Sequence, residues 1–318
     1  MTAPGRPAED LGALDTERSR PDLADLDQWS TRRIVDLITA EDAAVVAAVR
    51  AEAPRIAAVA ELAVERLARG GRLVYGGAGT AGRLAVLDAT ELAPTYGVGE
   101  DRVVALLAGG RGAMTEAVEG AEDDTAAARA DLAALRPGPD DVVVAISASG
   151  RTPWARALLE AARAAGAATA CVVNNPGGPV AALADVAITL RTGPEIVAGS
   201  TRMKAGTSQK MTLTALSTAV MVRLGKVHGN LMVDVAATNL KLRVRAERIV
   251  GEATGATPDA VRAALTDAGG HAKTAIVALL AGVDAAGASA LLTAADGRVS
   301  AAVAAGAAGA AGAAGAAR

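Results

Sequence analysis

The chain has 318 residues and a formal net charge of −3; 51% of its residues are hydrophobic and 21% are charged. This length accommodates one large domain with a smaller one, and the charge balance leaves no basic surface for nucleic acid or an anionic membrane. Only 1% of the residues are aromatic, so stacking faces for single-stranded nucleic acid are scarce. We therefore expect a globular protein that binds no nucleic acid.

Cysteine content and hydropathy indicate where in the cell the protein is found. Cys171 is the single cysteine, so no internal disulfide can form, and no CxxC or His/Cys cluster offers zinc ligands. The N-terminal residues are polar and acidic, unlike a secretory signal, and no apolar run approaches the roughly 20 residues that span a bilayer. These features predict a cytoplasmic protein with no membrane association and no metal site.

The first 70 residues predict an arm followed by helices. Residues 1–29 contain prolines and few apolar positions, which is typical of an extended arm that gains order only against another part of the protein. Residues 30–70 favour helices over 31–38 and 40–67, the second opening on acidic residues that suit a helix N-terminus.

A glycine-rich strand–loop–helix unit follows. Leu73 to Tyr75 form a short β-type run, Gly76 to Gly82 contain four glycines, and Arg83 to Leu92 carry apolar residues at helical spacing. Backbone N–H groups in such a loop and at the following helix N-terminus bind anions. The pattern predicts an anion site here, with Glu91 near the end of its helix.

The alternation of strands and helices continues to residue 250. We expect strands at 103–108, 142–146, 169–173 and 186–190, and helices at 113–118, from about 124, at 153–165 and over most of 199–233. Near-continuous apolar strands between helices predict an α/β domain over 71–250 with a doubly wound parallel sheet. Ligands bind such sheets beyond the carboxyl ends of the strands, which is where both the glycine loop and Ser147 to Thr152 fall.

The C-terminal part changes character. Residues 251–303 predict a small three-helix subdomain, with helices at 258–267, 271–281 and 285–295 separated by glycines. The Ala/Gly tail at 304–318 has nothing to bury against a core and is predicted to be disordered.

The glycine loop formally matches a dinucleotide-binding fingerprint through Gly77, Gly79 and Gly82. That interpretation requires an acidic residue at the end of the second strand, where this chain has Ala108 followed by glycines. A P-loop fits less well, because Arg83 stands where the Gly-Lys-Ser/Thr sequence is required. Nucleotide binding is therefore disfavoured.

The second loop suits a single phosphate group. Ser147, Ser149 and Thr152 place three hydroxyls beside free backbone N–H groups, without the lysine and magnesium ligands that nucleoside triphosphates need. A sugar phosphate is the natural ligand. A Ser/Thr turn that only caps a helix is the alternative for this loop taken alone.

Carboxylates are the candidate acid–base groups. Glu91 ends a helix, and further carboxylates lie at a helix junction where they can face a cleft, although all are compatible with ordinary surface positions: Glu119, Glu122 and Asp123. His228 and His271 lie singly on apolar segments, which is more typical of packing or surface residues than of a catalytic base.

Several segments, taken in order, resemble one known family, the N-acetylmuramic acid 6-phosphate etherases, which have the sugar isomerase (SIS) fold. The segments are LDTER at 14–18, GRLVYGGAGTAGRL at 71–84, LDATELAPTYG at 87–97, AVEGAED at 117–123, ASGRTP at 148–153, GPE at 193–195, GSTRMKAGTSQK at 199–210 and NLMVD at 230–234. The resemblance covers about residues 14–303. The segments are specific for this family when they occur together in this order, whereas no single segment is.

The resemblance implies cleavage of the lactyl ether of N-acetylmuramic acid 6-phosphate to N-acetylglucosamine 6-phosphate and D-lactate, in peptidoglycan sugar recycling, without a metal or organic cofactor. In the open-chain sugar the C2 proton lies α to the C1 aldehyde. A base can remove it, lactate can leave from C3, and water can add to the double bond. Such a path needs two carboxylates whose pKa values are pushed apart.

By match to the family's motifs, Glu91 protonates the leaving lactate oxygen and Glu122 handles the C2 proton or the incoming water, the division between them being open. The resemblance assigns the 6-phosphate to Gly79, Thr80, Ser147, Ser149, Gly150 and Thr152, and further substrate contacts to Ser200 and Lys273. It also implies a homodimer with sites near the subunit boundary.

The chain departs from the family's pattern at a few positions. Ala81 stands where the phosphate loop usually has a serine, Leu92 and Ala93 replace Cys-Pro after the catalytic glutamate, and Ser147 and Trp154 replace the commoner Ala and Tyr. One neutral hydrogen bond contributes roughly 0.5–1.5 kcal/mol, and one to a charged group contributes more. We expect weaker phosphate affinity but not loss of the site, with Ser147 as a candidate replacement donor.

Two other functions share this fold. A related non-enzymatic regulator binds hexose phosphates with the same loops and controls a kinase, but it normally carries two SIS domains in a longer chain. Sugar-phosphate isomerases use other bases. The presence of both Glu91 and Glu122 in a chain with one α/β domain favours the etherase.

Overall fold

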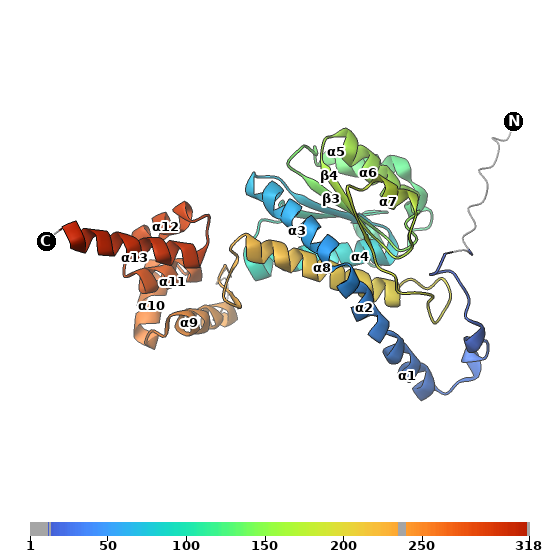
Figure 1. Cartoon of the computed structure of the whole chain (residues 1–318), viewed down its shortest axis with the longest axis horizontal. Coiled ribbons are helices and arrows are strands. Elements are labelled where there is room, and N and C mark those ends of the chain that lie inside the picture. The colour runs from blue at the N-terminus through green and yellow to red at the C-terminus, as the bar shows by residue number, and fades with distance from the viewer. Residues whose placement is uncertain (1–11, 13, 235–239, 317–318) are drawn as a thin grey trace. The chain divides into compact units, whose positions relative to one another are not determined.

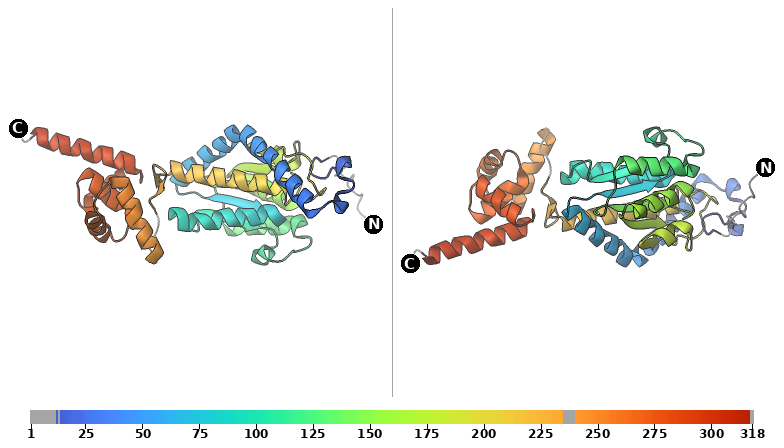
Figure 2. Two further views of the ribbon diagram at one scale, coloured as in Figure 1. Left: turned by 90° about the horizontal axis from the view of Figure 1, so that it is seen from below. Right: turned by 90° about the horizontal axis from the view of Figure 1, so that it is seen from above.

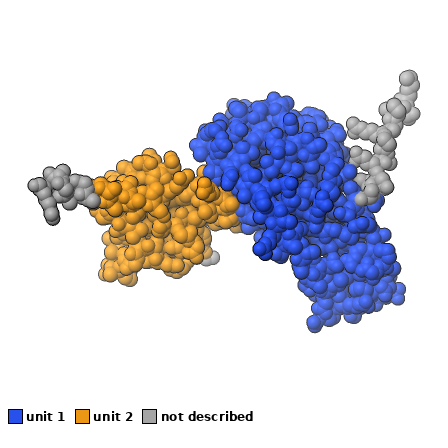
Figure 3. Space-filling view, in the orientation of Figure 1, with its two compact units in different colours: residues 1–89, 101–217 blue, residues 90–100, 218–318 orange. Residues whose placement is uncertain are grey.

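The computed structural model describes residue 12, residues 14–234 and residues 240–316. The chain forms two compact units (Figure 3), of which the first comprises residues 1–89 and 101–217 and the second comprises 90–100 and 218–318. The second unit therefore begins ahead of residue 251, where the sequence placed the start of the helical subdomain. Residues 1–11 and 13 of the predicted arm lie outside the described residues.

Within the described residues, the first unit contains a five-stranded parallel sheet with the strand order β2-β1-β3-β4-β5. The strands are β1 (Leu73–Gly77), β2 (Val103–Leu107), β3 (Val142–Ser147), β4 (Ala168–Val173) and β5 (Val186–Thr189). Every residue of β1, β3 and β4 is buried, which explains why these strands are almost continuously apolar in the sequence. The predicted α/β class with a doubly wound parallel sheet is confirmed.

Helices cover both faces of this sheet (Figures 1 and 2). One face carries α5 (Thr125–Ala134), α6 (Pro153–Ala164) and α7 (Pro179–Leu183), and the other carries α3 (Ala53–Ala68), α4 (Gly79–Tyr96) and α8 (Lys204–Arg223). The core under α6 is built around Trp154 and Leu158, which are fully buried. The arm contains the short turns η2 (Pro21–Leu23) and η3 (Leu26–Gln28), and leads into α1 (Thr31–Glu41) and α2 (Ala43–Ala51).

The direction in which successive strands are added to the sheet reverses between β1 and β3. From β1 the chain passes through α4 to β2 on one side, and from β3 it passes through α6 to β4 on the other. Gly77 pairs with Ile146 in the parallel register, so the two strands end side by side. Doubly wound sheets form their ligand crevice at such a switch point, which here follows Gly77 and Ser147.

Two predicted helices in this unit differ from the structure. The helix predicted over 40–67 is divided between α2 and α3, because Pro54 in the first turn of α3 has no N–H with which to continue α2. The helix predicted over 113–118 is wrong, since only the 3₁₀ turn η4 (Arg111–Met114) forms there. The helix expected from about 124 is α5, whose N-cap Asp124 accepts from the N–H of Ala127 at 2.9 Å.

The long helix predicted over 199–233 is also too long. It ends at Arg223, and Gly225 follows with φ +73°, a left-handed conformation that stops a helix. The next residues form the antiparallel pair β6 (Val227–His228) and β7 (Leu231–Met232), joined through Gly229. This hairpin belongs to the second unit.

The second unit is otherwise helical. It contains α9 (Leu240–Thr254), α10 (Pro258–Asp267), α11 (Ala272–Ala281), α12 (Ala285–Ala294) and α13 (Val299–Ala316) around a core that includes Val250 and Ile276. The helices α10, α11 and α12 correspond to the three that the sequence predicts. No single helix among the described residues is long and apolar enough to cross a membrane; α11 and α12 meet that length and composition only as a pair bent by 100°.

The tail from residue 304 is helical through Ala316 rather than disordered, and residues 317–318 lie outside the description. Alanine has the highest helix propensity. Gly306 also lets α13 approach α11 closely, since a Cβ at that position would lie 2.8 Å from Cβ of Ala281. Small residues thus provide the tail with a packing surface that composition alone did not reveal.

Candidate active site

A cavity of about 330 Å³ lies at the switch point, beyond the carboxyl ends of β1 and β3. Ala78, Gly79, Thr80 and Ala81 line it after β1; at the end of β3 and in the loop that follows, the lining residues are Ser147, Ala148, Ser149 and Thr152. Distant parts of the chain complete the wall with Glu17, Glu122, Gly199, Thr201 and Gln209. The structure therefore brings the two loops singled out in the sequence into one cavity, together with Glu122.

The first loop allows α4 to begin almost directly after β1. A Cβ on Gly82 would lie 2.3 Å from the carbonyl oxygen of Gly77, so only glycine permits this close approach of helix and strand. Gly79 has φ +54° and opens the helix. The first N–H groups of a helix have no intrahelical acceptor and carry partial positive charge. The N-terminus of α4 thus supplies anion-binding groups to the cavity.

Hydroxyl groups in the second loop contact one another. Ser147 Oγ lies 2.8 Å from Thr152 Oγ1 and 3.4 Å from Ser149 Oγ, and it accepts from the N–H of Gly150 at 3.1 Å. Gly150 has φ +68°, a left-handed conformation, and its N–H also donates to the carbonyl of Ser147 at 3.1 Å, which closes a turn after β3. Although Thr152 is the N-cap residue of α6, its side chain makes no capping hydrogen bond. The loop is therefore more than a helix cap.

The charge of the cavity wall is acidic. Glu17 and Glu122 line it, whereas neither lysine nor arginine does so in the described part of the chain. The groups at this wall that can bind an anion are hydroxyls, backbone N–H groups and the N-terminal dipoles of α4 and α6. Across the same described residues, no group of three or more His, Cys, Asp or Glu side chains is placed to hold a metal ion.

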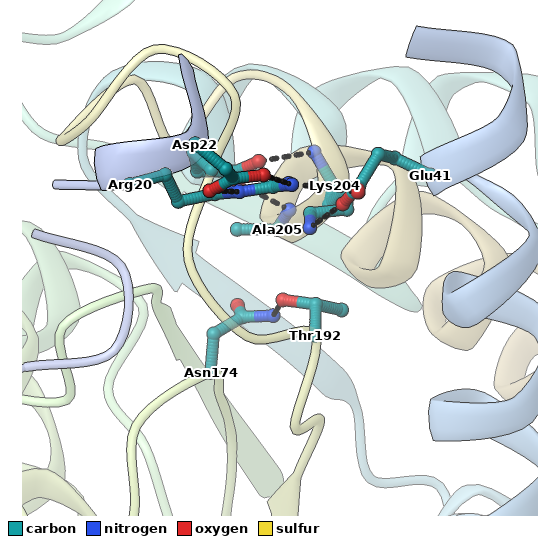
Figure 4. A network of polar contacts seen from close by, with 8 residues as sticks. Arg20, Asp22, Glu41, Asn174, Thr192, Lys204 and Ala205 are labelled. Carbon is teal, nitrogen blue, oxygen red and sulfur yellow. Dashed lines mark hydrogen bonds and ion pairs between the residues drawn. The ribbon is translucent and has the colours of Figure 1, made fainter. Parts of the chain in front are cut away.

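A third helix N-terminus, that of α8, is occupied by a carboxylate of the protein. Glu195 is 1% exposed and accepts from the N–H groups of Lys204 at 3.0 Å and Ala205 at 2.8 Å. Burial raises the pKa of Glu195, and these two hydrogen bonds only partly oppose the rise. Lys204 Nζ in turn donates to Glu41 at 2.6 Å, and Arg20 donates to the other oxygen of Glu41 at 2.7 Å (Figure 4). Glu195, Lys204, Glu41 and Arg20 therefore bind one another within the chain.

The N-terminal arm reaches the cavity. Thr16 is fully buried, its carbonyl accepts from the N–H of Gly199 at 2.9 Å, and its Oγ1 accepts from Asn175 Nδ2 at 2.9 Å. These bonds bring the next residue, Glu17, into the wall. Sequence reasoning assigned no role to Glu17, although it lies in the LDTER segment; Gln209, in the GSTRMKAGTSQK segment, was missed in the same way.

The remaining predicted site residues lie elsewhere. Gly150 and Ser200 are in the loops that border the cavity but are not among the described residues lining it. Glu91 is exposed on the part of α4 that belongs to the second unit. The resemblance implies that Glu91 and Glu122 act as the two acid–base groups of one reaction. That shared role stays a prediction.

Lys273 belongs to a charged cluster in the second unit. Its Nζ donates to Asp234 at 2.6 Å, and Lys226 Nζ lies 3.1 Å from the same carboxylate oxygen. Burial lowers the pKa of Lys273, and the hydrogen bond and charge of Asp234 oppose that effect. The predicted substrate contact of Lys273 stays a prediction.

The strand order is that of a doubly wound α/β fold with its crevice at the switch point, and the sequence match identifies this domain as a SIS domain. Residues 116–219 match the SIS domain family, and residues 55–163 match the family described as the glucokinase regulatory protein N-terminal SIS domain. A phosphoheptose isomerase from Francisella tularensis is similar in structure, with a TM-score of 0.48 and 19% identity over 60% of this chain and 98% of that chain.

Within that class, the chain belongs to the N-acetylmuramic acid 6-phosphate etherase family. It is 52% identical over 282 residues to the N-acetylmuramic acid 6-phosphate etherase of Deinococcus radiodurans, covering 89% of this chain and 92% of that protein. It is 52% identical over 296 residues to the enzyme of that name from Streptomyces avermitilis, covering 93% and 95%. The family expected from the sequence is confirmed.

Proposed function

We propose that this protein is a carbon–oxygen lyase that converts N-acetylmuramic acid 6-phosphate and water to N-acetylglucosamine 6-phosphate and D-lactate, in peptidoglycan sugar recycling. The observation that carries the proposal is the cavity in which the α4 N-terminus, the hydroxyl loop and Glu122 converge. Relatives that are 52% identical over about nine-tenths of the chain carry this enzyme's name.

The 6-phosphate is assigned to the two loops. Thr80, Ser147, Ser149 and Thr152 supply hydroxyls. Gly79 and Gly150 give the two loops the positive φ angles that place these hydroxyls. Charge-assisted hydrogen bonds from such groups are stronger than neutral ones. With the phosphate anchored there, the sugar chain extends along the cavity towards Glu122, which lines the same wall. Ser200 and Lys273 are proposed as further contacts to the sugar.

Two carboxylates move the protons. A carboxylate takes the C2 proton, the C2–H electrons form a C2=C3 double bond conjugated with the C1 aldehyde, and the C3–O bond breaks as lactate takes a proton. Water then adds at C3, and C2 regains a proton. We assign the lactate oxygen to Glu91 and the C2 proton or the water to Glu122. No metal or organic cofactor enters the proposed reaction.

The two rival functions use the same phosphate site. A sugar-phosphate regulator would bind the compound without changing it, and an isomerase would move the carbonyl without releasing lactate. The etherase family membership does not favour either of them. The experiment is incubation of the purified protein with N-acetylmuramic acid 6-phosphate, in which D-lactate and N-acetylglucosamine 6-phosphate should form in equal amounts. Binding without lactate would support the regulator instead.

A homodimer is the proposed assembly. The helix α1 has no buried residue, and Val35 on α1 and Val46 on α2 are 49% and 56% exposed. Apolar side chains left on the surface of adjoining helices suit contact with a second copy. Sedimentation velocity should give twice the monomer mass, and Val46→Lys should shift the distribution towards monomer. The cytoplasmic location is likewise proposed, and fractionation of the source cells tests it.

A further inference from the structure

We propose that Arg83 binds the carboxylate of the substrate's lactyl group in a second cavity that adjoins the phosphate cavity. This inference rests on the proposed function and adds to it the place where the C3 substituent is recognised.

The second cavity also has a volume of about 330 Å³ and shares Ala78, Gly79 and Glu122 with the first. The two cavities therefore meet at Glu122. A sugar with its 6-phosphate in the first cavity and its lactyl group in the second would carry C2 and C3 past this carboxylate. That arrangement suits the base that the elimination needs near C2.

Arg83 enters the second cavity from α4, one helical turn after Gly79. Its Nε donates to the carbonyl of Ala113 at 2.8 Å, and its Nη2 donates to the carbonyl of Glu116 at 3.1 Å. A guanidinium has five N–H donors, so these two bonds orient the group and leave donors for an anion. Among the described residues, no further acceptor takes them.

Charge favours this assignment. The substrate carries two anions, the phosphate and the lactyl carboxylate, and the described wall of the first cavity offers no cationic side chain to the second of them. Arg83 is half-buried, whereas Glu119 and Glu122 in the wall of the second cavity are exposed and better screened by water. Arginine binds carboxylates in a planar, bidentate geometry. The anion therefore belongs at the Arg83 end of the cavity.

The rest of the wall suits the lactyl methyl group. Ala113, Ala117 and Val118 line the second cavity beside Arg83. A small group with one methyl and one carboxylate matches a wall that combines short apolar side chains with one cation. N-acetylglucosamine 6-phosphate lacks this group, so Arg83 should distinguish substrate from product.

The test compares N-acetylmuramic acid 6-phosphate with its neutral lactyl carboxamide, measuring lactate or lactamide release and calorimetric binding. Wild type should prefer the acid by about tenfold or more, the effect of a hydrogen bond to a charged group. Arg83→Gln should lose this preference while binding N-acetylglucosamine 6-phosphate as wild type does. Arg111→Gln is the matched control, because Arg111 is exposed in the same loop region and lines neither cavity.

Three results would overturn the inference: equal treatment of acid and carboxamide by wild type, a preference retained in Arg83→Gln, or a parallel loss of product affinity in that variant. The last two would mean that Arg83 only supports the loop through Ala113 and Glu116. Failure of the proposed function is distinguishable, because wild type would then release nothing from either compound. The calorimetric comparison would still decide the role of Arg83.

Discussion

Ser147 and Thr152 hydrogen-bond to each other, Oγ to Oγ1 at 2.8 Å, where β3 ends and α6 begins. Ser147 is only 3% exposed, so its hydroxyl orients Thr152, which lines the cavity with it. The pair fixes hydroxyl groups at a helix N-terminus before any ligand arrives. Pre-organised donors of this kind lower the entropy lost on binding.

Thr152→Val should therefore raise KM for N-acetylmuramic acid 6-phosphate by about tenfold, because it removes a hydroxyl that donates to the phosphate and one of the hydrogen-bond partners of Ser147. Steady-state kinetics with thermal melting tests this. Thr293→Val, an exposed position on α12 whose hydroxyl donates only to the carbonyl of Ser289, is the control and should leave KM unchanged. A lower melting temperature with an unaltered KM would show that the pair only stabilises the fold.

Ala81→Ser restores the hydroxyl that the family usually has. Ala81 is 7% exposed and lines the cavity in the first turn of α4. The added donor should lower KM by about two- to tenfold, the effect of one further hydrogen bond. Ala126→Ser on the exposed side of α5 serves as control. An unchanged KM would mean that the hydroxyls at 147–152 already satisfy the phosphate.

The elements around the phosphate loops could be predicted because their signals are local. The strands at 73–75 and 142–146 are short apolar runs that end in glycine or hydroxyl residues, and parallel strands place such ends at one edge. The structure confirms both strands and joins their loops in one cavity. Glu122 could be proposed from a helix junction, which is the turn η5 (Ala121–Asp123) before α5.

Other parts depended on contacts distant in the chain. Glu17 reaches the cavity because Thr16 bonds to Gly199 and Asn175, and no pattern within residues 14–18 reports this. The spacing of apolar residues after Arg223 favours a continued helix, but Gly225 and Gly229 both adopt positive φ and a hairpin forms instead. The helical tail depends on the close packing of Gly306 against α11.

The pair of Arg72 and Asp141 locks the start of β1 to the start of β3. Arg72 donates from Nη2 to Asp141 Oδ2 at 2.7 Å and from Nε to Oδ1 at 3.0 Å, and the N–H of Gly138 also donates to Oδ2. Burial raises the pKa of Asp141, but the bonds from Arg72 and Gly138 outweigh it and hold the pKa below its ordinary value. The carboxylate is thus more acidic in the folded protein.

Asp141→Asn should lower the free energy of unfolding by about 2 kcal/mol near neutral pH, because the paired charge is lost. A depressed folded pKa contributes stability above the unfolded pKa and loses it as pH falls through the folded value. The difference between wild type and variant should therefore be full above about pH 5 and shrink below about pH 4. Denaturant titrations measure it, with the more exposed Asp140→Asn as control. If the difference in unfolding free energy between wild type and Asp141→Asn were the same above about pH 5 and below about pH 4, the charge argument would be contradicted.

Substitution of either catalytic glutamate should lower turnover without weakening the binding of the sugar phosphate. Glu91→Gln and Glu122→Gln should each reduce kcat by about 100-fold or more, since general acid–base groups contribute roughly 10²–10⁴. Binding of N-acetylglucosamine 6-phosphate should persist in both. Asp123→Asn is the matched control, because Asp123 is exposed in the same turn as Glu122 and lines neither cavity. If turnover in either variant equals wild type, that residue is not one of the two acid–base groups.

Turnover in ¹⁸O-labelled water tests the proposed reaction most directly. Elimination breaks the C3–O bond, so D-lactate keeps the ether oxygen and the label appears in the C3 hydroxyl of N-acetylglucosamine 6-phosphate. We predict one labelled oxygen in each sugar product and unlabelled lactate in equal amount. Release of no lactate, or release of lactate that carries the label, would contradict the account.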